Sequence, residues 1–141
     1  MGDYPGGLIL IITGTTLRAE QMDRPLAYYL QNQIDELGAG HDDRLALVIS
    51  DRYYLTHPDL HGLPTISVGG PGVNRLTQRL LKKLPAALAA DGKFFIQMDP
   101  DDRDLRVSIW GMDNPQTRIA VVTFAERYLA HFVNLCWQRQ A

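Results

Sequence analysis

The chain has 141 residues, of which 45% are apolar and 21% are charged, so it is long enough for one hydrophobic core and too short for two ordinary domains. A net charge of −2 and a pI near 6.0 argue against nucleic acid or an anionic membrane as a partner, because both attract clustered lysine and arginine. The single cysteine, Cys136, excludes an intrachain disulfide, and the first residues show no leader pattern. We therefore expect one cytoplasmic domain over residues 1–141.

Branched apolar runs predict two buried strands, at residues 8–12 and 45–49, since strands covered on both faces are continuously apolar. Between them, residues 25–37 place apolar side chains at helical spacing and predict a helix. This strand–helix–strand order implies a right-handed parallel crossover. The polar and aromatic residues 50–64 are predicted to form a long connecting loop, of the kind that is often functional or mobile.

The second half of the chain alternates the same elements. We predict a strand at residues 65–68, a helix at 72–90 and an antiparallel hairpin of strands 93–98 and 105–110. The last helix is expected to start at Asn114-Pro115, which supplies an N-cap and a proline in the first turn. The order β-α-β-β-α-β-β-α predicts an α/β fold, a three-layer sandwich with a mixed, mainly parallel sheet.

Ligands of open α/β sheets usually bind beyond the carboxyl ends of the parallel strands, where this chain carries small and polar residues. The most informative segment is TISVGGPGVN, residues 65–74, in which a strand runs through a glycine–proline turn into a helix start. Free N–H groups and the helix dipole at such a joint favour an anion. We predict a concave site for a sulfate, phosphate or carboxylate, lined by Gly14, Thr15, Thr16, Asp51, Gly69, Gly70, Gly72, Asn74, Asp113 and Arg118.

Two of these side chains have alternative roles. Asn74 either caps the second helix or points into the cleft. Arg118 either pairs with Asp51 or Asp113, which would be a structural contact, or stays free and clamps an anion.

Cofactor and metal motifs are absent from the sequence. The glycine turn is neither a P-loop nor a dinucleotide fingerprint, so we expect no cofactor. His57, Asp59 and His61 supply only part of a metal site, because structural sites need four ligands. The turn at residues 99–104 fails the EF-hand pattern, because Asp104 stands where that loop requires glycine. We therefore predict no metal.

The last helix carries apolar residues on more than one side. Beyond its inner stripe it places five more, Val121, Phe124, Tyr128, Leu135 and Trp137. A helix that is apolar on nearly every side must be buried on nearly every side. Either other parts of the chain cover it or a second subunit does, and we expect a homodimer.

Residues 69–74, GGPGVN, and 111–120, GMDNPQTRIA, resemble the GGPxxN and GxDxxxTRxA motifs that occur in this order in archaeal surface-layer proteins and in bacterial proteins of unknown function. The whole chain is more similar to the uncharacterised bacterial group. The resemblance implies a non-catalytic α/β module and supplies no catalytic residues.

Two functional hypotheses follow. The first is a non-enzymatic α/β binding or interaction module. The second is a small enzyme acting on an anionic metabolite, such as a phosphorylated one, at residues 69–74. An enzyme needs a titratable group at that loop, and Asp51, Asp113 and Arg118 are the sequence candidates.

Overall fold

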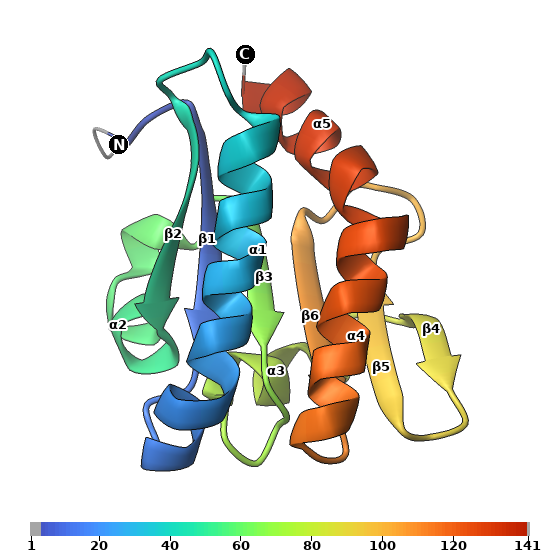
Figure 1. Ribbon diagram of the computed structural model, residues 1–141. Coiled ribbons are helices and arrows are strands. Elements are labelled where there is room, and N and C mark those ends of the chain that lie inside the picture. Colours follow the sequence, from blue (N-terminus) through green and yellow to red (C-terminus); the bar gives the residue numbers. More distant parts are fainter. Residues whose placement is uncertain (1–3, 141) are drawn as a thin grey trace.

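Six strands form a single mixed sheet, in the order β2-β1-β3-β6-β5-β4, in the computed structural model, which describes residues 4–140 (Figure 1). They are β1 (Gly7–Thr13), β2 (Arg44–Ser50), β3 (Thr65–Val68), β4 (Ala86–Ala90), β5 (Phe94–Met98) and β6 (Arg106–Gly111). The pairs β2–β1, β1–β3 and β3–β6 are parallel, and β5 is antiparallel to both β6 and β4. The predicted α/β fold with a mixed, mostly parallel sheet is therefore confirmed.

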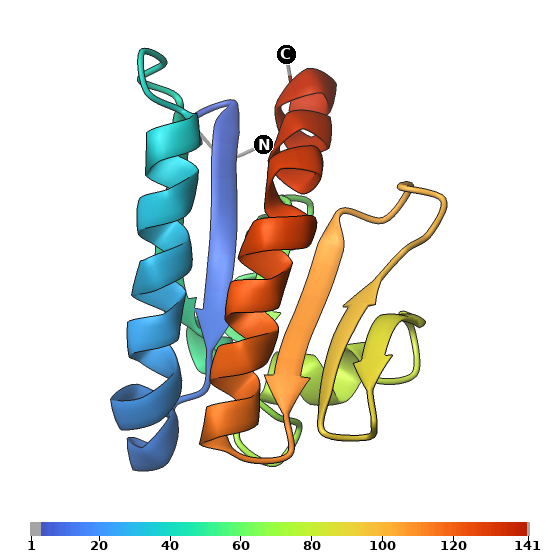
Figure 2. The ribbon, with the colours of Figure 1, turned by 45° about the vertical axis from the view of Figure 1, so that its right-hand side comes forward.

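Helices cover both faces of this sheet. They are α1 (Arg24–Leu37) with a preceding π-helical turn η1 (Ala19–Asp23), α2 (Asp51–Thr56), the 3-10 turn η2 (Pro58–Leu60), α3 (Arg75–Leu80), α4 (Asn114–Arg127) and α5 (Leu129–Gln140). Figures 1 and 2 show α1, α4 and α5 on one face and the short helices α2 and α3 on the other. Each face has its own apolar core, so the chain forms three layers.

Strand β1 lies at the centre of the parallel part of the sheet. Its side chains alternate, with Ile9 and Ile11 in the core beneath α1 and α4, and Leu8, Leu10 and Ile12 in the core beneath α2 and α3. All of these side chains are buried. Burial on both faces explains why the strand is a continuous apolar run rather than an alternating one.

The predicted helix at residues 72–90 is wrong in its second half. Helix α3 ends at Leu80, and residues 86–90 form β4, which pairs with β5 at the sheet edge. Pro85 lies just before this strand, and a proline in a helix lacks an N–H and clashes with the carbonyl four residues earlier. The chain therefore leaves the helix, although alanine and leucine favour it, and adds a sixth strand.

The predicted loop at residues 50–64 is also more ordered than expected. It contains α2 and η2, and α2 is capped by Ser50, whose Oγ accepts a hydrogen bond from the Tyr53 N–H at 3.1 Å. Tyr54 and Leu60 from this segment are buried against the sheet. The segment is thus part of the second layer and not a free loop.

The last helix is divided at Tyr128, whose φ of −124° leaves the helical range and separates α4 from α5. Val121, Phe124 and Trp137, which the sequence pattern placed outside the inner stripe, are buried in the core of the chain itself. The indole N–H of Trp137 donates to the Gly7 carbonyl at 3.0 Å. Tyr128 and Leu135, the other two, are half-buried, so the homodimer stays a prediction with less apolar surface than the sequence pattern suggested.

No helix within residues 4–140 combines the length and the apolar character needed to cross a lipid bilayer.

Candidate functional site

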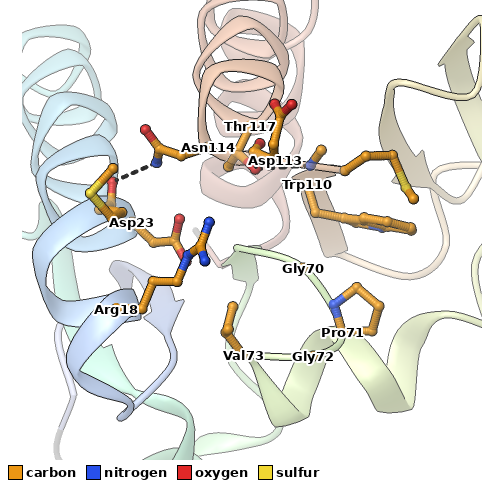
Figure 3. A pocket seen from close by; sticks show the side chains of 13 residues that line it. Arg18, Asp23, Gly70, Pro71, Gly72, Val73, Trp110, Asp113, Asn114 and Thr117 are labelled. Carbon is orange, nitrogen blue, oxygen red and sulfur yellow. Dashed lines mark hydrogen bonds between the residues drawn. The ribbon is translucent and has the colours of Figure 1, made fainter.

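The sheet has its switch point between β1 and β3. The chain leaves β1 through α1 to reach β2 on one side, and then returns through α2 to β3 on the other side of β1. Loops that leave neighbouring strands in opposite directions open a crevice beyond their carboxyl ends. A cavity of about 350 Å³ lies there, lined by Arg18, Met22 and Asp23 after β1, by residues 70–73 after β3, and by residues 110–114 and Thr117 at the end of β6 and the start of α4 (Figure 3).

Asp23 is the unusual residue of this cavity. Asp23 is only 6% exposed, and its carboxylate accepts no hydrogen bond from residues 4–140, although its oxygens are not fully enclosed. Burial raises the pKa of Asp23 from 3.8 to about 6, and the nearby positive charge of Arg18 opposes that rise. In Figure 3 Asp23 and Arg18 lie on the same side of the cavity. The cavity therefore contains a carboxyl group that titrates just below neutral pH.

Gly69 makes room for this carboxyl group at the end of β3. Its φ of +113° is a conformation that residues with a side chain rarely adopt. A Cβ atom added at Gly69 would lie 2.6 Å from Asp23 Oδ2, closer than real contacts allow. The backbone therefore favours glycine here, and a larger residue would also displace the Asp23 carboxylate.

The opposite side of the cavity is apolar. Figure 3 shows the Trp110 ring and Pro71 across from Arg18 and Asp23. The Trp110 indole is fixed, because its N–H donates to Gln97 Oε1 at 3.1 Å and its ring packs on Phe95 with centroids 4.5 Å apart. The site thus combines an ionisable side with a flat, preorganised apolar side.

Asn74 is a structural residue that joins the two strands of the switch point. It is 1% exposed, and its Oδ1 accepts from the N–H groups of Leu76 (2.9 Å) and Thr77 (3.2 Å). Its Nδ2 donates to the carbonyls of Ile12 (3.1 Å) and Val68 (2.9 Å), at the ends of β1 and β3. The predicted cap of the second helix is confirmed, and the alternative role in the cleft is excluded.

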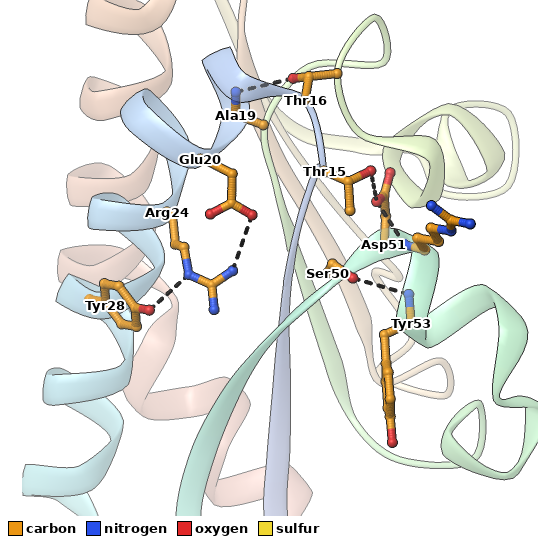
Figure 4. Close-up of polar contacts among 10 residues, drawn as sticks. Thr15, Thr16, Ala19, Glu20, Arg24, Tyr28, Ser50, Asp51 and Tyr53 are labelled. Atoms are coloured by element: carbon orange, nitrogen blue, oxygen red, sulfur yellow. Dashed lines mark hydrogen bonds and ion pairs between the residues drawn. The ribbon is translucent and has the colours of Figure 1, made fainter.

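Asp51 accepts a hydrogen bond from another N–H group at the start of α3. Its Oδ2 accepts from the Arg75 N–H at 2.8 Å, while Oδ1 accepts from the Arg52 N–H at 2.7 Å and from the Thr15 hydroxyl at 3.2 Å (Figure 4). Together with Asn74, it engages the first N–H groups of α3. The prediction that these groups are free to hold an anion is therefore wrong, because the chain's own oxygens already accept from them.

The second motif also builds a helix start. Asp113, and not Asn114, is the N-cap of α4, and its Oδ1 accepts from the Gln116 N–H at 2.9 Å. Thr117 Oγ1 accepts from the Gly111 N–H at 3.0 Å and donates to the Asp113 carbonyl at 3.1 Å. A Cβ at Gly111 would overlap the backbone of Gln116 and Thr117. These contacts explain the Gly, Asp and Thr of GxDxxxT without any ligand.

The other predicted site residues divide between the cavity and its surroundings. Gly70, Gly72 and Asp113 line the cavity. Gly14 packs against the Val73 backbone, and Thr16 Oγ1 accepts from the Ala19 N–H at 3.1 Å (Figure 4).

Arg118 is exposed, and it contacts neither Asp51 nor Asp113 through any ion pair in the described part of the chain. It also does not line the cavity, where Arg18 is the cation instead. Sequence reasoning missed Arg18, Asp23 and Trp110. Asp23 precedes a helix that has a proline in its first turn, and a carboxylate at that position is usually read as a cap.

The two histidines of the η2 region are engaged locally. His57 Nδ1 lies 2.7 Å from the Tyr53 carbonyl, and His61 Nε2 lies 2.8 Å from the Tyr54 carbonyl. Each ring stacks on the tyrosine that supplies this carbonyl. Among residues 4–140 no three histidine, cysteine, aspartate or glutamate side chains group closely enough to hold a metal ion.

Neither a protein-family model nor a curated protein matches this chain.

Proposed function

We propose that the protein is a non-enzymatic α/β binding module, and that its ligand is a small molecule with an apolar ring and a hydrogen-bond-donating, neutral or cationic nitrogen. The observation that carries this proposal is the Asp23 carboxylate, which is largely buried, borders the cavity and accepts no hydrogen bond from residues 4–140, with Arg18 as its neighbouring charge. A largely buried carboxylate that accepts no hydrogen bond is costly, so a donor brought by a ligand supplies a hydrogen bond that the chain lacks.

The charge of the lining favours a cation over an anion. The charged side chains of the cavity are Arg18, Asp23 and Asp113, so above pH 6 the carboxylates outnumber the guanidinium. An amidinium or ammonium group beside Asp23 forms a charge-assisted hydrogen bond. Because Asp113 is exposed and caps α4, the carboxylate that a ligand meets inside the cavity is that of Asp23, and this proposal replaces the anionic ligand that the glycine turn suggested.

The apolar side of the cavity indicates the shape of the uncharged part of the ligand. Trp110 and Pro71 offer a flat surface across from Asp23, which suits an aromatic or alicyclic ring. The volume of about 350 Å³ lies at the lower end of small-molecule sites. A ligand with one ring and one donating group matches this size and this arrangement.

A pair of probes with the same ring and opposite charge tests the proposal. Benzamidinium and benzoate are titrated separately into the ¹⁵N-labelled protein at pH 7.5. Benzamidinium is expected to shift the amide resonances of Gly70, Gly72 and Asn114, whereas benzoate is expected to leave them unchanged. Removing the charge of Asp23 is expected to weaken benzamidinium binding about tenfold.

The matched control is Asp42→Asn, because Asp42 is an exposed carboxylate in the connection between α1 and β2 and does not line the cavity. The proposal fails if benzoate binds as well as benzamidinium, or if Asp23→Asn and Asp42→Asn have the same effect. It also fails if neither probe shifts the resonances of the cavity residues.

A small enzyme is the second candidate, and the pKa of Asp23 favours it. A carboxyl group that titrates at about 6 is suited to acid–base catalysis near neutral pH. Against this, the lining contains no serine, cysteine, histidine or lysine within the described chain, and the Thr117 hydroxyl already bonds to the Gly111 N–H and the Asp113 carbonyl, so a covalent route is left with the aspartates as nucleophiles. Turnover of a chromogenic amide or ester that rises with deprotonation of Asp23 and is lost in Asp23→Asn would favour the enzyme.

The cytoplasmic location and the homodimer belong to this proposal as predictions. The resemblance of residues 69–74 and 111–120 to non-catalytic modules supports the binding role.

A further inference from the structure

A second concave region lies at the opposite edge of the sheet, beside the amino ends of β3 and β6. It consists of two adjoining cavities of about 510 Å³ and about 110 Å³, which share His61 and Arg106 in their walls. Figure 2 shows the end of α5 and the turn before β6 at this end of the molecule. The region is separate from the Asp23 cavity, since the two have no lining residue in common.

Cations dominate the walls of this region, although the chain as a whole has a net charge of −2. The charged side chains in the two linings are Arg79, Lys83, Arg103, Arg106 and Arg139, with Asp104 as the carboxylate. They come from α3 and the segment after it, from the turn before β6, from β6 and from α5. The fold therefore gathers positive charge that is spread along the sequence.

Two of the arginines are held in place by the protein. Arg106 forms a bidentate pair with Asp104, with Nε 2.8 Å from Oδ1 and Nη2 2.6 Å from Oδ2. Arg139 donates instead to the main-chain carbonyls of Asp102 and Arg103, which orient its guanidinium without neutralising its charge. A cation fixed in this way loses little freedom when an anion binds.

Four of the cations are not neutralised by a carboxylate of the described chain. Within residues 4–140, no ion pair joins Arg79, Lys83, Arg103 or Arg139 to a carboxylate. Asp104 neutralises Arg106, and the remaining cations leave an excess of positive charge in the walls.

The acidic turn beside the region does not cancel this excess at the walls. Asp99 accepts hydrogen bonds from the N–H groups of Asp101, Arg103 and Asp104, which hold its carboxylate inside the turn. Asp102 Oδ2 lies 3.3 Å from His131 Nε2, on α5. Neither carboxylate lines the cavities.

From this arrangement we infer that the region binds a small, multiply charged anion with two linked phosphate groups. The cations divide between the two cavities, since Arg79 and Lys83 line the smaller one, Arg103 and Arg139 line the larger one, and His61 and Arg106 line both. Two phosphates match two such groups, and arginine suits phosphate because its planar donors bind two oxygens at once.

A nucleic acid fits the region less well. Single-stranded nucleic acid is held by aromatic side chains on which the bases stack. The aromatic residues of the linings are Tyr54, which is 3% exposed, and His61, which already stacks on Tyr54. A compact diphosphate needs no such stacking surface.

Isothermal titration of inorganic pyrophosphate into the protein, at ionic strength held constant with KCl, tests the inference. Lys83→Gln and Arg103→Gln each remove one unpaired cation, and each is expected to weaken pyrophosphate binding about tenfold. Lys82→Gln is the matched control. Lys82 is the neighbour of Lys83 and carries the same charge, but its side chain lines neither cavity.

The inference is supported if Lys83→Gln and Arg103→Gln weaken binding and Lys82→Gln does not. It is overturned if pyrophosphate does not bind, if all three variants weaken binding equally, or if polyglutamate or single-stranded DNA binds more tightly than pyrophosphate. Because Asp23→Asn is expected to leave pyrophosphate binding unchanged, this result is independent of the proposed amine site.

Discussion

Replacing Asp23 with asparagine is expected to stabilise the folded chain at neutral pH, although it removes the proposed ligand contact. The pKa of Asp23 is about 6 in the folded state and 3.8 in the unfolded chain, because burial disfavours the charged form. The folded state therefore holds the proton more tightly than the unfolded state does. The stability that this gives is fully present below pH 3.8 and is lost as the pH rises through about 6.

The size of this effect follows from the two pKa values. Each pKa unit corresponds to about 1.4 kcal/mol, so the full difference corresponds to about 3 kcal/mol. The Asp23 carboxylate is not fully enclosed, so solvent screening reduces this figure, and we expect a gain of about 2 kcal/mol for Asp23→Asn at pH 8. Asparagine has nearly the same shape and carries no charge at any pH, so the gain should shrink towards zero near pH 4.

Urea unfolding followed by circular dichroism, at several values between pH 4 and pH 8, measures this gain as a function of pH. Asp42→Asn is the control, because Asp42 is exposed and its replacement should not change the free energy of unfolding in a pH-dependent way. The reasoning is refuted if Asp23→Asn is no more stable than the wild type at pH 8, or if its gain is the same at pH 4 and pH 8.

Two further substitutions, Asn74→Asp and Gly111→Ala, test the frame around the cavity, and Gly72→Ala is the control for the second. Asn74→Asp removes the donor to the Ile12 and Val68 carbonyls and buries a charge. It should lower the free energy of unfolding by about 3 kcal/mol in urea titrations. An unchanged unfolding midpoint would contradict the structural role of Asn74. Gly111→Ala should lower the free energy of unfolding by roughly 1 kcal/mol or more, because the added Cβ overlaps the backbone of Gln116 and Thr117. Gly72→Ala should be nearly neutral, because no atom lies within 4 Å of its added Cβ. Equal melting temperatures for the two variants would exclude the overlap at Gly111.

Much of the fold is predictable because its strands and long helices have simple patterns. The apolar runs of β1 and β2 and the helical spacing of α1 each indicate the element that the structure contains. Strand β4 was missed because its sequence, AALAA, has a high helix propensity, and its strand conformation comes from pairing with β5. Pro85 was the local signal that the preceding helix had to end.

The turns and helix caps around the candidate site could be predicted from the sequence, but the side chain that gives the site its charge could not. The glycines and Asn74 at the end of β3 mark a joint that needs tight turns and a helix cap, and both requirements are local in sequence. Asp23 lies in the loop after β1, and its role depends on Gly69, which is distant in the chain and leaves space for the carboxylate. A contact of this kind between distant segments leaves no periodic or local pattern, so it required the structure.

The two motif segments and the cavity side chain therefore have complementary roles at the switch point. Asn74 and Thr117 form hydrogen bonds to the chain around them, and such satisfied polar groups make a rigid frame. Asp23 borders the same cavity without a partner in the described chain, although a buried charge without a partner reduces stability. Stability alone would favour a neutral residue at this position. A carboxylate that lowers the stability of a rigid frame is expected where its charge is used, and the cavity beside it is the place where a ligand would use it.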